Sequence, residues 1–189
     1  LSQPLEWTHD SRYLITLLVP EERGSAPEAS PVPVTPKVRM STEGRNVLRT
    51  FPSLLQTPED AQLLKYYATA QLARIEVPSG RIHWIGKPSL IRSIDPSPDG
   101  EFIRVTTIQE PFSYLVPASQ FGSKEEIWDV QGEVKASLAD RPLRLSGDTP
   151  PADSGRQGAE RRNLAWRPDG KGLSFLQRAP RESPQGEDS

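Results

Sequence analysis

The sequence contains no cysteine. This absence excludes a disulfide framework, a thiolate zinc site and a cysteine nucleophile. Long apolar runs are also missing: no stretch approaches the roughly 18 apolar residues of a membrane-spanning helix, so we expect no membrane span. Neither sign of charge is in large excess. The net charge of −2 gives little attraction toward nucleic acid, and we expect no nucleic-acid partner.

Apolar residues are scarce, at 34% of the 189 residues, whereas proline is abundant, with 20 residues. The proline share is about twice the usual value of roughly 5%. Because proline is excluded from helix interiors and central strands, much of the chain must be loop. The sequence begins at Leu1 with residues that already resemble the middle of a strand unit, and no signal-peptide pattern is visible. We therefore expect a fragment of a longer protein.

Three segments share a hairpin pattern, namely residues 5–18, 94–108 and 164–176. Each has a short apolar strand, a polar turn centred on Asp-Gly or Asp-Ser, and a second strand with β-forming residues. In such turns proline presets φ, aspartate bonds back to the backbone, and glycine accepts a positive φ. We interpret Asp10, Asp99 and Asp169 as turn-stabilising residues, since none has the closely spaced oxygen donors of a calcium loop.

Two further hairpins are predicted at residues 72–85 and 126–138. A Pro-Asp-Gly hairpin followed by a Trp-Asp-Val hairpin makes one four-stranded sheet, which is the unit of a propeller blade. We predict an all-β fold: a partial β-propeller of two to three antiparallel four-stranded blades, with one short inserted helix near residues 58–69. Four tryptophans fall in predicted strands and are expected to pack between blades: Trp7, Trp84, Trp128 and Trp166.

The predicted domain organisation is an incomplete propeller over residues 1–176 and a disordered tail over 177–189. The proline-rich segment 20–37 is expected to be an extended or disordered loop, and 148–162 a second loop. Thr57 is a strong N-cap, followed by Pro58 at the first helical position and by acidic residues, so a helix of about three turns should begin there.

No catalytic, cofactor-binding or metal-ligating residue is predicted. The nearest approach to a Gly-x-Ser-x-Gly nucleophile elbow is Gly172 to Leu176, in which leucine replaces the second glycine and Ser174 lies within a predicted strand. His9 is assigned to turn chemistry and His83 to cross-strand packing, because neither has the spacing of a zinc site. The Gly86-Lys87-Pro88-Ser89 run lacks the upstream glycine of a phosphate-binding loop.

Three carboxylates cluster in sequence at Glu125, Glu126 and Asp129. Strand alternation places them on different faces, so paired acid–base chemistry is not expected of them. We interpret them as a solvated strand edge.

Several segments together resemble the propeller of glutamyl endopeptidase-like enzymes, a branch of the prolyl oligopeptidase family of serine peptidases. They are residues 49–55, 66–72, 97–100, 107–117, 127–129 and 162–167, with the Phe121 region. The Pro-Phe-Ser-Tyr-Leu-Val-Pro run at 111–117 is the most specific of them. The resemblance covers most of residues 5–176.

This resemblance implies a C-terminal α/β-hydrolase domain as a partner in the parent protein, carrying a Ser, Asp, His triad in that order. The propeller would cap that active site and limit access to short or unfolded peptide substrates. None of the triad residues maps onto this sequence, and no arginine can be singled out as the partner of a substrate glutamate. Family analogy favours a periplasmic or secreted location, although the sequence itself leaves the compartment unknown.

A counting argument supports a larger context. A closed propeller needs roughly four to eight blades of about 40–50 residues each, and this chain has material for two to three. Two alternatives remain open: a non-enzymatic propeller of the TolB type that scaffolds protein partners, and a stand-alone small binding domain. The flanking coding sequence separates them, since only the peptidase continues into a nucleophile elbow.

Overall fold

The computed structural model describes residues 5–28, 54–143, 162–170 and 172–177. These residues form ten strands, one α-helix and one short 3-10 helix. The chain divides into two compact units, Leu1–Asp148 and Thr149–Ser189. All strand pairings are antiparallel. The prediction of a mostly antiparallel β-fold with one inserted helix is therefore confirmed.

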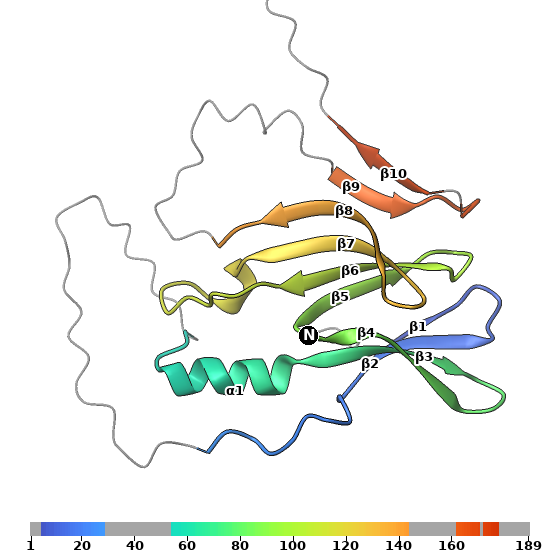
Figure 1. Cartoon of the computed structure of the whole chain (residues 1–189). Coiled ribbons are helices and arrows are strands. Elements are labelled where there is room, and N and C mark those ends of the chain that lie inside the picture. Colours follow the sequence, from blue (N-terminus) through green and yellow to red (C-terminus); the bar gives the residue numbers. More distant parts are fainter. Residues whose placement is uncertain (1–4, 29–53, 144–161, 171, 178–189) are drawn as a thin grey trace, which may run out of the picture. The chain divides into compact units, whose positions relative to one another are not determined.

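The first unit contains two four-stranded sheets, each built from consecutive strands (Figure 1). In the first sheet the order is β1-β2-β3-β4, with bounds Leu5–Trp7, Tyr13–Leu18, Ala70–Glu76 and Arg81–Ser89. In the second it is β5-β6-β7-β8, with bounds Ile91–Pro96, Phe102–Ile108, Ser123–Asp129 and Val134–Arg141. Leu90 alone separates β4 from β5. Four of the five predicted hairpins thus pair as expected in this unit.

The first turn of each sheet uses the same hydrogen bonds. In the β1–β2 turn, the Thr8 hydroxyl donates to Asp10 at 2.6 Å and accepts from the Tyr13 amide at 3.1 Å. In the β5–β6 turn, the Ser97 hydroxyl donates to Asp99 and accepts from the Phe102 amide at 3.0 Å. Both aspartates also accept from the backbone two residues on. These contacts confirm the turn-stabilising role predicted for Asp10 and Asp99.

The hydrophobic core lies between the two sheets. Ile15, Leu72 and Ile85 of the first sheet form one buried cluster with residues of the second, namely Ile91, Ile94, Ile103, Val105 and Trp128. Along β6 every second residue is buried, as the two-residue period of a strand requires. The face of β6 that carries Ile103 and Val105 therefore packs toward the first sheet.

The helix α1 spans Pro58–Ala68 and is inserted between β2 and β3. Thr57 and Asp60 form a capping box, in which the Asp60 amide donates to the Thr57 hydroxyl at 3.1 Å and the Thr57 amide donates to the Asp60 carboxylate at 2.9 Å. No residue of α1 is fully buried. The sequence correctly predicted this helix start because the capping signal is local.

The second unit contains a single described hairpin, β9 (Arg162–Trp166) with β10 (Leu173–Leu176). Of the predicted loops, 20–28 is described and has no helix or strand, whereas 29–37 and 148–161 lie outside the described residues. Arg162, assigned to the second loop, begins β9 instead. The predicted tail lies outside the described residues apart from Gln177. The extent of the predicted propeller domain, residues 1–176, stays a prediction.

The packing predicted for the tryptophans is only partly correct. All four lie in strands, as expected, and Trp128 is 7% exposed within the core. Trp7, however, in the edge strand β1, is 53% exposed. The local pattern identified the strand correctly but could not indicate which side of it would be covered.

Candidate functional site

The two sheets come into close backbone contact at Gly86 of β4 and Gly132 of the β7–β8 turn. A side chain at Gly132 would place its Cβ 2.1 Å from the Gly86 nitrogen and 2.2 Å from the Gly86 Cα. The Gly86 amide donates to the Gln131 carbonyl oxygen at 3.4 Å. Gly132 has φ of +85°, a conformation that favours glycine. We call this pair the glycine contact; only glycine at position 132 permits the approach.

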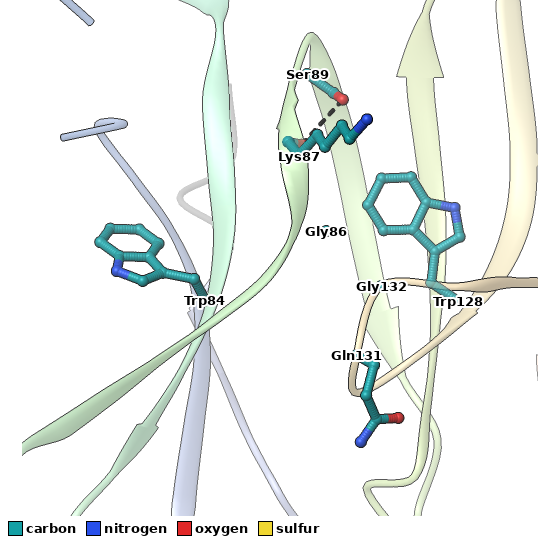
Figure 2. Close-up of a pocket in the computed structure, with 7 residues that line it drawn as sticks. All are labelled: Trp84, Gly86, Lys87, Ser89, Trp128, Gln131 and Gly132. Atoms are coloured by element: carbon teal, nitrogen blue, oxygen red, sulfur yellow. Dashed lines mark hydrogen bonds between the residues drawn. The ribbon is translucent and has the colours of Figure 1, made fainter. Parts of the chain in front are cut away.

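An open hollow of about 520 Å³ lies beside the glycine contact (Figure 2). Its lining residues are Trp84, Gly86, Lys87, Ser89, Trp128, Gln131 and Gly132. The Trp84 ring is turned away from Lys87 and Trp128 in this view. Lys87 is exposed and has no ion pair with any residue that the structure describes. A single ammonium group can attract an anion, but no carboxylate or histidine is among the described residues that line the hollow to act as a base beside Ser89.

A second open hollow, of about 530 Å³, lies between α1, the β4–β5 junction and strands β6 and β7. Two ion pairs line it: Lys65 with Glu110 at 2.6 Å, and Lys124 with Glu126 at 3.1 Å. Trp128 donates from Nε1 to Glu126 at 3.0 Å. Both carboxylates that line this hollow are therefore held in ion pairs with lysines.

The carboxylates Glu125, Glu126 and Asp129 do not form a solvated edge, so that prediction is wrong. Strand β7 is an inner strand, paired with β6 on one side and β8 on the other. Glu126 and Asp129 are buried, with 8% and 9% exposure. Glu125 is half-buried and lies 3.8 Å from Arg104 and 3.2 Å from Arg141. The sequence could not indicate these partners because they belong to neighbouring strands.

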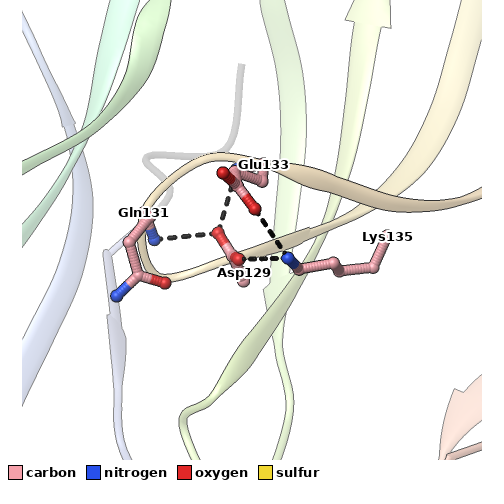
Figure 3. Close-up of polar contacts among 4 residues, drawn as sticks. All are labelled: Asp129, Gln131, Glu133 and Lys135. Carbon is pink, nitrogen blue, oxygen red and sulfur yellow. Dashed lines mark hydrogen bonds and ion pairs between the residues drawn. The ribbon is translucent and has the colours of Figure 1, made fainter.

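Asp129 holds the β7–β8 turn (Figure 3). Its Oδ1 accepts from the amides of Gln131 and Glu133, both at 2.9 Å, and its Oδ2 lies 2.8 Å from the Lys135 ammonium. The hydrogen bond from Lys135 is the main cause that lowers the pKa of Asp129, and the two amides lower it further. Asp129 and Glu133 together raise the pKa of Lys135. This network positions Gly132 for the glycine contact and is structural.

The residues considered for chemistry from the sequence lie in different turns and strands. His9 is exposed in the β1–β2 turn, and His83 lies opposite Arg74 in the β3–β4 pair. Ser174 is in β10 of the second unit, where its hydroxyl donates to the Ala165 carbonyl oxygen at 3.2 Å. Within the described ranges, no group of three or more histidine, aspartate or glutamate side chains could hold a metal ion. Within the first unit, His9 and His83 lie on separate elements, a turn and β4, and no contact joins them among the described residues.

Sequence reasoning missed the glycine contact. The signal was present in the Gly86-Lys87 run, which was considered only as a phosphate-binding loop, and in the turn glycine at position 132. No helix in the described part of the chain has the length and hydropathy that a membrane crossing requires.

Comparison with known proteins shows that the chain is similar to part of two plant proteins named as probable glutamyl endopeptidases. No family model matches the chain. It is 41% identical over 166 residues to a probable chloroplastic glutamyl endopeptidase of Oryza sativa subsp. japonica, and 36% identical over 166 residues to one of Arabidopsis thaliana. Each alignment covers 86% of this chain but only 17% of the relative. The chain is thus related to one limited segment of proteins named as peptidases.

Proposed function

We propose that this chain is a non-catalytic sector of the β-propeller of a serine peptidase of the prolyl oligopeptidase family, in its glutamyl endopeptidase-like branch. The similarity to two glutamyl endopeptidase-named proteins supports the peptidase relationship. Since the chain corresponds to 17% of those proteins, the reactive residues of the parent would lie in other segments.

The observation that carries the proposal is the pairing of two consecutive four-stranded meanders. Propeller blades are four-stranded antiparallel sheets that follow one another along the chain and pack face to face. The first unit has this order of strands, a core between the sheets and a one-residue junction at Leu90. The hairpin of β9 and β10 supplies half of a further blade in this interpretation. Residues 1–176 would then be an incomplete propeller.

The proposed role is control of access. A hydrolase domain elsewhere in the parent would supply the serine nucleophile, the histidine base and the oxyanion donors. The propeller would cap that site, so that short or unfolded peptides reach it and folded proteins do not. Such a role needs a rigid wall rather than reactive side chains, in keeping with the fully partnered carboxylates of β7.

The test uses the full polypeptide that contains this chain. We expect a Gly-x-Ser-x-Gly elbow downstream of it, and hydrolysis of unstructured, internally quenched peptides that contain glutamate. Replacement of the elbow serine by alanine should abolish this hydrolysis, and folded proteins should be cleaved far more slowly than peptides. A reading frame that contains only further propeller sheets would overturn the proposal in favour of a TolB-type scaffold. Equal cleavage of folded and unfolded substrates would overturn the capping role.

A further inference from the structure

The hollow beside the glycine contact is bounded by an edge strand on one side and by the second sheet on the other (Figure 2). Four of its seven lining residues belong to β4, the last strand of the first sheet: Trp84, Gly86, Lys87 and Ser89. The others belong to β7 and the β7–β8 turn. The volume of about 520 Å³ lies within the roughly 300–1,000 Å³ of ligand-binding clefts.

The outer edge of β4 presents backbone groups beside this hollow. The Gly86 amide donates to the Gln131 carbonyl oxygen across to the β7–β8 turn, so this amide points away from β3. Alternate residues of an antiparallel strand turn their amides to the same side, so Trp84 and Ile82 present theirs to this edge as well. Within the described part of the chain, β4 has no paired strand on that side. The edge therefore offers hydrogen-bonding groups to an extended peptide, as in strand addition.

Lys87 gives the hollow a positive charge that the described part of the protein does not neutralise. The other described lysines each form an ion pair with a carboxylate: Lys65, Lys124 and Lys135. Lys87 forms none with any described residue, and no carboxylate is among the residues that line the hollow. An exposed ammonium group without a carboxylate partner favours a negatively charged ligand.

The Trp128 ring gives one wall of the hollow a fixed apolar surface. Its Nε1 donates to Glu126 at 3.0 Å, so the polar atom of the indole already has a partner. The ring also packs on Gly86, where an added Cβ would lie 3.1 Å from the ring atom Cζ3. The aliphatic part of an acidic side chain suits such a ring, while its carboxylate reaches the ammonium group of Lys87.

We propose that this hollow binds an extended acidic segment of a peptide substrate, with a carboxylate on Lys87 and the peptide backbone along the outer edge of β4. The inference rests on the proposed function, which makes peptides the substrates, and it adds a recognition site built from this chain's own residues. A peptide fits better than a small anion. One exposed ammonium group holds a free anion only weakly, whereas backbone pairing supplies a second attraction.

Peptide binding to the full-length protein tests the site, with a covalent serine inhibitor occupying the proposed active site. The probe is a short fluorescein-labelled peptide that alternates glutamate with valine, and its control has glutamine in place of glutamate. Fluorescence anisotropy should show tighter binding of the glutamate peptide, and the difference should shrink as the salt concentration rises. Equal binding of the two peptides would overturn the inference.

Two lysine variants form a matched pair for this assay. Lys87→Met should weaken binding of the glutamate peptide about fivefold, as expected for loss of one exposed ion pair. Lys65→Met should leave binding unchanged, because Lys65 already pairs with Glu110 and does not line this hollow. An equal effect of the two variants would mean general attraction to surface charge, and the inference would then be wrong.

Amide hydrogen exchange in the same protein tests the position of the peptide backbone. Exchange at Ile82 and Trp84 should slow when the glutamate peptide binds, and unchanged exchange at both residues would contradict pairing along β4. If the protein self-associates through this edge and binds no peptide, the edge belongs to a second copy and the inference fails.

Failure of the inference can be told apart from failure of the proposed function. If neither peptide binds although the uninhibited protein hydrolyses peptides, the inference fails and the proposed function stands. If the full-length protein has no peptidase activity and no hydrolase domain, the proposed function itself fails.

Discussion

Replacing Gly132 with alanine should destabilise the first unit strongly, because the glycine contact has no room for a side chain. Three effects add. A positive φ costs alanine about 1 kcal/mol. Forcing the sheets apart to relieve a contact of 2.1 Å with the Gly86 backbone costs about 1–3 kcal/mol, as overpacking does elsewhere. The hydrogen bond from Gly86 to Gln131 adds about 1 kcal/mol when lost. We expect a loss of about 3 kcal/mol or more in the free energy of unfolding.

The matched control is Gly80→Ala. Gly80 has a similar φ of +68°, but a Cβ there would meet nothing within 4 Å. Only the conformational cost applies, so the loss should be about 1 kcal/mol. Urea unfolding followed by tryptophan fluorescence measures both variants, and a shifted midpoint at unchanged slope reports stability. Amide hydrogen exchange at Gly86 provides an independent reading of the contact. Equal losses in the two variants would refute the steric reasoning.

Three further outcomes follow from the polar contacts. Ser97→Ala should lower the free energy of unfolding by about 1–3 kcal/mol in urea titrations, because it removes the hydroxyl that accepts from the Phe102 amide. The control Ser89→Ala should lower it less, because the Ser89 hydroxyl only donates to the Lys87 carbonyl oxygen. Lys65→Met should change the free energy of unfolding by less than about 1 kcal/mol, because the ion pair of Lys65 with Glu110 is exposed. The contribution of the Asp129 contacts to the free energy of unfolding should be fully present above the ordinary pKa of 3.8. It should be lost as the pH falls through the lower pKa that Asp129 has in the folded state. Asp129→Asn should remove that part of the acid dependence, and an unchanged pH profile of unfolding would contradict the network.

The predictable parts of the fold are those that short sequence segments determine. The turns at Asp10 and Asp99 depend on bonds to residues within five positions, and the start of α1 depends on Thr57 and Asp60. The hairpins and their order into sheets followed from the same local signals. These features were expected correctly because no distant part of the chain is needed to specify them.

The missed features depend on distant pairing. Glu126 looked exposed in sequence, but pairing of β7 on both sides buries it beside Trp128 and Lys124. Trp7 looked like a packing residue, but on β1 it is 53% exposed. The glycine contact joins two positions whose local patterns indicate only an incomplete phosphate-binding loop, at Gly86, and a turn, at Gly132. A sequence pattern gives the period of a strand but not its neighbours.

The arrangement of the core also constrains synthesis of the protein on the ribosome. The first sheet is complete once β4 has emerged, yet its buried residues Ile15, Leu72 and Ile85 pack against Ile103 and Trp128 of the second. The nascent chain must therefore carry an uncovered apolar face until the strand containing Trp128 has been translated. Folding from the amino terminus is the usual order, and such a delay exposes the chain to misassociation. We expect chaperones to recognise this intermediate, and slower translation before residue 128 to prolong it.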